Sequence, residues 1–170
     1  MKFTQRGSAV ERAARFGRAA EGATAVEFAL VAAPFFFLLG GILEVGVMLL
    51  TEYRLQGAVD AAGRLLRTGQ AAVSTPQQFA AAICENSISI PDCPDRIGFV
   101  VDSATRFADI NMPDLANIGA GTRDFSPGGP NQAVLVVATV DWDFILPQMR
   151  LLSNLDNGTS RRLQGIAVFQ

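Results

Sequence analysis

The sequence predicts an α+β fold in which a long N-terminal helix, first membrane-spanning and then amphipathic, packs on a small antiparallel sheet domain. Two observations predict this fold. An apolar run leads directly into a stretch with helical spacing, and short runs typical of strands follow further along the chain. We therefore expect a leader over 1–22, a helix over 23–69 and an α+β domain over 70–170.

The apolar run is long enough to cross a membrane. Between Phe28 and Leu50 the only charged residue is Glu44. At about 1.5 Å per residue, this stretch gives roughly 34 Å of helix, against a hydrocarbon core of about 30 Å. We expect one transmembrane segment over about 28–50.

The charges on the two sides of this segment predict its orientation. The leader over 1–22 carries five basic residues and two acids, whereas the residues after Leu50 carry nine Arg and twelve acids. The positive-inside rule then places the leader in the cytoplasm and the C-terminal domain outside it. In a bacterium this is a single-pass inner-membrane protein with a periplasmic domain.

Two simpler interpretations compete for this segment. A cleaved secretory signal has a shorter apolar run that ends in small residues, and the polar stretch 51–54 offers no such site. An uncleaved anchor, in which Glu27 reaches water at the interface, explains the orientation. That second interpretation stays open, although it leaves the spacing of Gly22, Glu27 and Phe28 as a coincidence.

The stretch from Gly22 to Phe28 places an acid, Glu27, directly before the apolar run. A membrane helix tolerates an ionisable group mainly where a partner or water meets it, so Glu27 indicates a functional role. With Glu27 five residues and Phe28 six residues after Gly22, the stretch resembles the processing site of type IV pilins. That resemblance implies cleavage after Gly22 by a prepilin peptidase, a mature chain that begins at Ala23, and pairing of Glu27 with the new amino terminus of a neighbouring subunit.

Further residues narrow the resemblance to one family. After an Arg-rich leader the chain reads Gly22-Ala23-Thr24-Ala25-Val26-Glu27-Phe28-Ala29-Leu30, then Pro34, then Gly41-Ile42-Leu43-Glu44-Val45-Gly46. Over roughly residues 15–67 these features resemble the TadE family of Flp (tight-adherence) pilus assembly. The resemblance implies a pilin-like fold and a minor pseudopilin.

The resemblance also implies partners and leaves one alternative. The partners are the inner membrane, the prepilin peptidase, other pilins and pseudopilins, and the Tad inner-membrane platform. The alternative is a TadG-like scaffold or binding protein that is permanently anchored, faces the periplasm and is not cleaved.

One face of the membrane helix carries small residues, which let a second helix approach closely in lipid. The face consists of Ala25, Ala29, Ala33 and Gly40, and Glu44 extends it. Two interpretations of Glu44 stay open. The carboxylate faces a donor on a neighbouring helix, or it lies near the outer headgroups and reaches water unaided.

Beyond the membrane the helix continues, because Leu55, Val59, Ala62 and Leu66 recur at helical spacing and Gly69 is a plausible C-terminal stop. A short helix is expected over 75–84, capped by Ser74 or Thr75. Apolar and alternating runs predict strands over 97–101, 133–144 and 163–169. Turn residues fill 125–131, and Asn157 with Gly158 reads as a turn rather than as a glycosylation site.

The two cysteines, Cys84 and Cys93, both lie on the side expected to be oxidising. We expect them to form an intramolecular disulfide, with a buried reduced pair or intermolecular bonding as the alternatives. Closing so short a loop contributes about 2.5 kcal/mol in the chain-entropy model. Two cysteines in a chain without histidine leave a zinc site short of its preferred ligands.

Catalysis has little support in the sequence. Because the chain has no His, the Ser-His and Cys-His nucleophile systems are excluded. The acids of the C-terminal region are scattered, and Asp141 and Asp143 are expected on the solvated face of a strand. The region is slightly acidic, which disfavours nucleic-acid binding. We expect a structural protein without a catalytic, cofactor or metal site.

Overall fold

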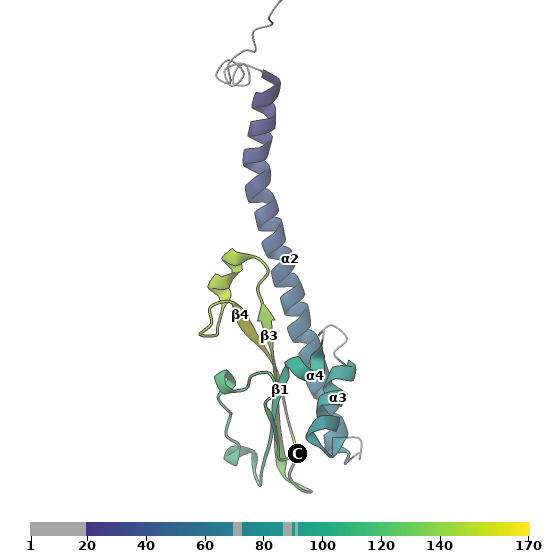
Figure 1. Ribbon diagram of the computed structural model, residues 1–170. Coiled ribbons are helices and arrows are strands. Elements are labelled where there is room, and N and C mark those ends of the chain that lie inside the picture. Colours follow the sequence, from purple (N-terminus) through teal and green to yellow (C-terminus); the bar gives the residue numbers. More distant parts are fainter. Residues whose placement is uncertain (1–19, 70–72, 87–89, 91) are drawn as a thin grey trace, which may run out of the picture. The chain divides into compact units, whose positions relative to one another are not determined.

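The computed structural model describes residues 20–69, 73–86, 90 and 92–170 (Figure 1). The chain divides into two compact units, one that ends at Ile42 and one that runs from Leu43 to Gln170. Of the expected leader over 1–22, residues 1–19 lie outside the described residues. The expected fold class, an α+β fold with a long N-terminal helix, is confirmed.

Helix α2 runs from Ala20 to Arg67 and contains Pro34. It begins three residues before the expected start of the mature chain, so the backbone at Gly22 is already helical. Gly69 follows with a φ of 66°, and its N–H donates to the carbonyl of Leu66 at 3.0 Å. The expected stop is thereby confirmed, because glycine adopts this left-handed conformation without steric cost.

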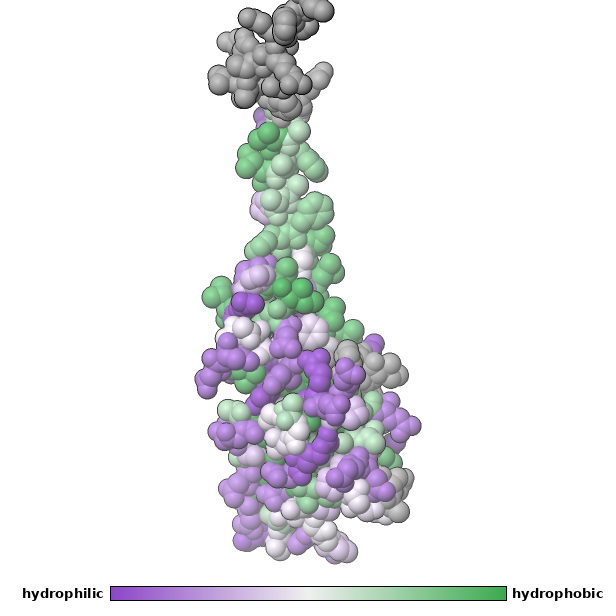
Figure 2. Space-filling model, viewed as in Figure 1, coloured by the Kyte–Doolittle hydropathy of each residue, from purple (hydrophilic) through white to green (hydrophobic). Residues whose placement is uncertain are grey.

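The first unit contributes the N-terminal part of α2. Its described side chains are mostly exposed, and they are mostly hydrophobic (Figure 2). Within the described part of the chain, α2 is the one helix long and apolar enough to cross a membrane. This agrees with a single-pass membrane protein.

The second unit contains a four-stranded sheet in the order β2-β1-β3-β4. The strands are β1 (Ile97–Ala104), β2 (Arg123–Phe125), β3 (Ala133–Asp143) and β4 (Ser160–Phe169). Each of the three expected strands is present. The fourth, β2, has only three residues and was too short to produce a sequence pattern.

The sheet is mixed, which corrects the expectation of a purely antiparallel sheet. Strand β3 pairs antiparallel with both β1 and β4, but β2 pairs parallel with β1. The connection between β1 and β2 contains two single-turn 3₁₀ helices, η2 (Phe107–Asp109) and η3 (Leu115–Asn117). It returns the chain to the beginning of β1, so β2 runs in the same direction as β1.

Strand β3 is buried on both faces from Ala133 to Val140. On one face Val136 and Ala138 join the main core with Leu55 and Val59 of α2. On the other face Leu135 and Val137 pack with residues of the β1–β2 connection, among them Ile118. This two-sided burial explains why the strand reads as a continuous apolar run rather than as an alternating one.

Helix α3 (Pro76–Asn86) and the short helix α4 (Cys93–Arg96) complete the core. The N–H of Gln78 donates to Thr75 Oγ1, and the N–H of Thr75 donates to Gln78 Oε1, which is a capping box. A disulfide joins Cys84 of α3 to Cys93 at the start of α4, as expected.

Candidate functional site

The buried face of α2 in the second unit starts earlier than the sequence predicted. Buried residues recur in steps of four and three along the helix: Glu44, Met48, Thr51, Leu55, Ala58 and Ala62. Val59, which is also buried, widens the face. Because Glu44 and Met48 lie inside the expected membrane segment 28–50, the domain covers the helix over residues assigned to lipid.

Glu44 is the polar residue that begins this face, and its side chain binds the domain. The residue is 7% exposed. Its Oε1 accepts a hydrogen bond from the N–H of Ile145 at 2.5 Å, and its Oε2 accepts one from the N–H of Leu146 at 3.1 Å. These two backbone groups immediately precede the 3₁₀ helix η4 (Pro147–Leu152).

The contact gives Glu44 a location that neither interpretation of the sequence anticipated. A carboxylate that accepts two backbone N–H bonds is compensated for leaving water. The carboxylate therefore has hydrogen-bond partners within its own chain. No sequence signal identifies the partners, because they are main-chain groups more than one hundred residues away.

A small apolar cluster surrounds this contact. Met48 of α2 packs with Phe144 and Leu163, and Trp142 and Met149 add partly buried side chains. The cluster is separate from the main core. Together with the Glu44 hydrogen bonds it holds the segment after β3 against α2.

A second polar contact joins α2 to the outer edge of the sheet. Gln56 Nε2 donates to the carbonyl of Ile166 at 2.8 Å, and the N–H of Ile166 donates to Gln56 Oε1 at 2.9 Å. Asn154 makes the same pair of bonds to the main chain of Arg162. Since β4 is an edge strand, these amides occupy main-chain groups that would otherwise be open to another strand.

The acids near the end of β3 are not simply solvated. Asp141 accepts two hydrogen bonds from Arg162, at 2.7 Å from Nε and 2.9 Å from Nη2. Arg162 Nη1 also donates to the carbonyls of Leu115 and Ala116, so the side chain fastens the β1–β2 connection. The hydrogen bonds to Asp141 raise the pKa of Arg162, and burial opposes the shift. Asp143 forms a longer ion pair with Arg96, at 3.6 Å.

The candidate residues of the first unit lie on an exposed helix surface. Glu27 and Phe28 are exposed, and so are the small residues Ala25, Ala29 and Ala33, whereas Gly40 is partly covered. Ala23 is exposed in the first turns of α2, one residue after Gly22. Each of these side chains is accessible in the single chain, so cleavage and packing between subunits stay predictions.

The structure gives little support for a small-molecule or metal site. Among the described residues, no group of three or more His, Cys, Asp or Glu side chains is placed to hold a metal ion. A shallow cleft of about 530 Å³ lies where α2 ends, between Arg67 and the loop at Pro127. The features that distinguish this chain are instead the contacts and exposed faces of α2.

Residues 22–64, which cover most of α2, match the family model described as TadE-like protein. No curated protein and no solved structure matches the chain. The resemblance read from the sequence is thus confirmed over this stretch, which begins at Gly22 and includes both Glu27 and Glu44. The chain carries a TadE-like domain, and this domain indicates involvement in Tad/Flp pilus assembly.

Proposed function

We propose that this chain is a minor pseudopilin-like component of Flp pilus assembly and that a prepilin peptidase cleaves it after Gly22. The observation that carries the proposal is the TadE-like match, whose first residue is the glycine of the expected cleavage site. The match then follows α2 almost to its end at Arg67. A structural family of pilus assembly is also in keeping with a chain that lacks His.

In this proposal the leader faces the cytoplasm and the C-terminal domain faces the periplasm. Cleavage creates a new amino terminus at Ala23, and Glu27 pairs with that terminus in a neighbouring subunit. The exposed acid supports this role, because a carboxylate in an apolar helix is costly in lipid until it meets a partner. Phe28 completes the recognition sequence, and the peptidase and the Tad inner-membrane platform act on the membrane-stored chain.

Packing between subunit helices would use the small residues of α2. Ala25, Ala29 and Ala33 are exposed in the single chain and so are available to a neighbouring helix. Glu44 is different, because its carboxylate is already bound to Ile145 and Leu146.

Cleavage is tested by the intact mass of membrane-extracted protein, with and without a co-expressed prepilin peptidase. We expect the loss of residues 1–22 only when the peptidase is present. Gly22→Val should abolish this loss, whereas Gly17→Val, a matched change within the leader, should leave it intact. An unprocessed chain beside an active peptidase would favour the permanently anchored TadG-like alternative.

Assembly is tested separately from cleavage. Glu27→Ala should leave the mass change intact and should strongly reduce the number of pili in a strain that depends on this chain. Glu52→Ala removes another acid of α2 and serves as the matched control. Normal piliation by the Glu27→Ala variant would contradict the assigned role of Glu27.

A further inference from the structure

The segment after β3 exposes large apolar side chains beside α2. In the 144–152 segment, Ile145 is 80% exposed and Leu151 is 92% exposed. Phe144 and Met149 of the same segment pack with Met48, so one side of the segment is held against α2 while Ile145 and Leu151 are exposed. Exposed leucine and isoleucine side chains within one short segment commonly mark a surface that contacts a membrane or another protein.

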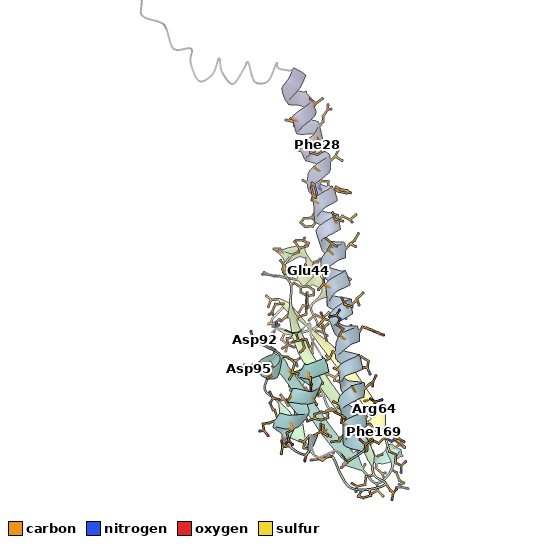
Figure 3. The ribbon with its side chains drawn as sticks, turned by 90° about the vertical axis from the view of Figure 1, so that its right-hand side faces the viewer. Phe28, Glu44, Arg64, Asp92, Asp95 and Phe169 are labelled. Carbon is orange, nitrogen blue, oxygen red and sulfur yellow. A yellow bond between two sulfur atoms is a disulfide. The ribbon has the colours of Figure 1, made fainter. Side chains whose placement is uncertain are left out.

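The level of this segment along α2 is fixed by Glu44. The carboxylate binds the N–H groups of Ile145 and Leu146 directly, so the start of the segment lies at residue 44 of the helix (Figure 3). On α2 itself, the apolar residues Leu43, Val47 and Leu50 are exposed over the same turns. The apolar surface of the helix and that of the 144–152 segment therefore lie at one level.

The composition around this level is typical of a membrane interface. The chain has a single Tyr and a single Trp. Tyr53 is exposed on α2 just past Leu50. Tyr is enriched where a membrane meets water, since it combines an apolar ring with a polar atom. Trp142 instead packs in the cluster around Met48, where its indole N–H is buried.

The charges near the 144–152 segment favour lipid over a protein partner as what covers its exposed apolar side chains. The 144–152 segment contains no acid, and its one charged residue, Arg150, is exposed. Arg161 lies beside it, with Nη1 donating to the carbonyl of Leu152 at 3.0 Å. The acid directly before the segment, Asp143, is exposed and pairs with Arg96 at 3.6 Å. Apolar side chains with two arginines nearby match the boundary between acyl chains and anionic headgroups.

We propose that the 144–152 segment lies in the outer interface of the bilayer that α2 crosses, with Ile145 and Leu151 inserted among the lipids. The domain thus binds the membrane surface at a second place besides its helix. This rests on insertion of α2 but not on cleavage at Gly22. It also shortens the fully lipid-surrounded part of the helix, since one side of α2 from Glu44 onward faces protein.

The test places tryptophan at defined positions of the full chain in vesicles of phosphatidylethanolamine and phosphatidylglycerol. Trp142→Phe provides a background without tryptophan, to which Leu151→Trp or Ile145→Trp is added. Part of the lipid carries bromine, a contact quencher, either near the headgroup or near the end of the acyl chain. We expect a large loss of emission at 145 and 151 with the shallow bromines and a much smaller loss with the deep ones.

Two further variants serve as controls in the same background. Phe107→Trp places the probe at another exposed apolar position, three residues beyond the end of β1 at Ala104, and should keep its emission. That end of the sheet is opposite the one at Asp143, because Ala104 pairs with Ala133. Phe37→Trp reports insertion of α2 and should be quenched by the deep bromines.

Quenching at Phe37→Trp without quenching at 145 and 151 would overturn the interface proposal while leaving the membrane anchor intact. Absence of quenching at Phe37→Trp would overturn the anchor and this proposal together. Emission at 151 that is unquenched in vesicles but shifts to shorter wavelength as subunits assemble would assign the surface to a neighbouring subunit, and would also overturn it.

Discussion

The side-chain amide of Gln56 pairs with both main-chain groups of Ile166, 110 positions further along the chain. The amide joins α2 to the edge strand β4 through one donor and one acceptor, which is the pair of hydrogen bonds that a neighbouring strand would make to Ile166. We expect Gln56→Ala to lower the free energy of unfolding by about 1–3 kcal/mol, because the main-chain N–H and carbonyl lose their partners. Urea unfolding of detergent-solubilised protein measures this change.

Gln77 provides the control for that change. It is exposed on α3, so Gln77→Ala should alter the free energy of unfolding by no more than about 0.5 kcal/mol. Equal effects of the two substitutions would show that the Gln56 amide contributes nothing specific.

Glu44 should hold the 144–152 segment in place. Glu44→Ala leaves two N–H groups without their acceptor, at a cost of about 1–3 kcal/mol. The measurable consequence is faster hydrogen exchange at the amides of Ile145 and Leu146, with little change in the central strands. Glu44→Gln keeps one acceptor oxygen and should restore part of the protection, whereas Glu52→Ala should change neither amide.

Two glycines of the second unit should respond to alanine with opposite signs. A Cβ at Gly165 would lie 3.0 Å from Val59 Cγ2 and 3.1 Å from the carbonyl oxygen of Leu55, so β4 lies close against α2 at this residue. Gly165→Ala should therefore destabilise the protein by about 1–3 kcal/mol. A Cβ at Gly57 meets nothing within 4 Å, so Gly57→Ala should stabilise α2 by about 0.5–1 kcal/mol. Thermal unfolding of the two variants compares them directly, and equal signs would contradict this description of the helix–strand contact.

Arg162 should contribute more to the free energy of unfolding than an exposed surface arginine does. Its side chain is 10% exposed and binds Asp141 as well as two carbonyls. Arg162→Ala should cost about 1–3 kcal/mol, because a partly buried carboxylate and two carbonyls lose their donors. Arg106→Ala breaks the exposed pair with Asp109 and should cost less than about 1 kcal/mol. Chemical denaturation of both variants checks the difference.

The pH dependence of the Arg162 contribution follows from its pKa. Hydrogen bonds to Asp141 raise the pKa of Arg162 above its unfolded value, so the guanidinium is charged in both states near neutrality. Stabilisation by a group whose pKa is raised is fully present below the unfolded pKa and is lost as the pH rises through the folded one. The loss of stability caused by Arg162→Ala should therefore not vary near neutrality through the titration of Arg162. It should become smaller only in strong alkali, where the guanidinium loses its proton.

The elements that the sequence predicted well are those whose signal is local. The strand that begins at Ala133 and a helix cap at Ser74 or Thr75 follow from periodicity and neighbouring residues. The strand is present, and Thr75 is the residue that caps α3. Strand β2 was missed because three residues cannot show a period. The bonds of Glu44 and Gln56 were missed for another reason, since their partners are main-chain groups distant in sequence. The neighbouring sequence identifies Glu44 as an unusual acid within an apolar run, but it does not identify the groups that donate hydrogen bonds to its carboxylate.

The redox state of Cys84 and Cys93, which form a disulfide, reports the compartment in which the domain lies. These thiols oxidise stably only in a compartment that favours disulfides, and their redox state can be read in intact cells by alkylation before lysis. A chain whose domain has crossed the membrane would resist the alkylating reagent, whereas a chain retained in the cytoplasm would react with it. Combined with the mass of the leader, this measurement would show whether translocation of the domain precedes or follows processing, without any tag or fusion partner.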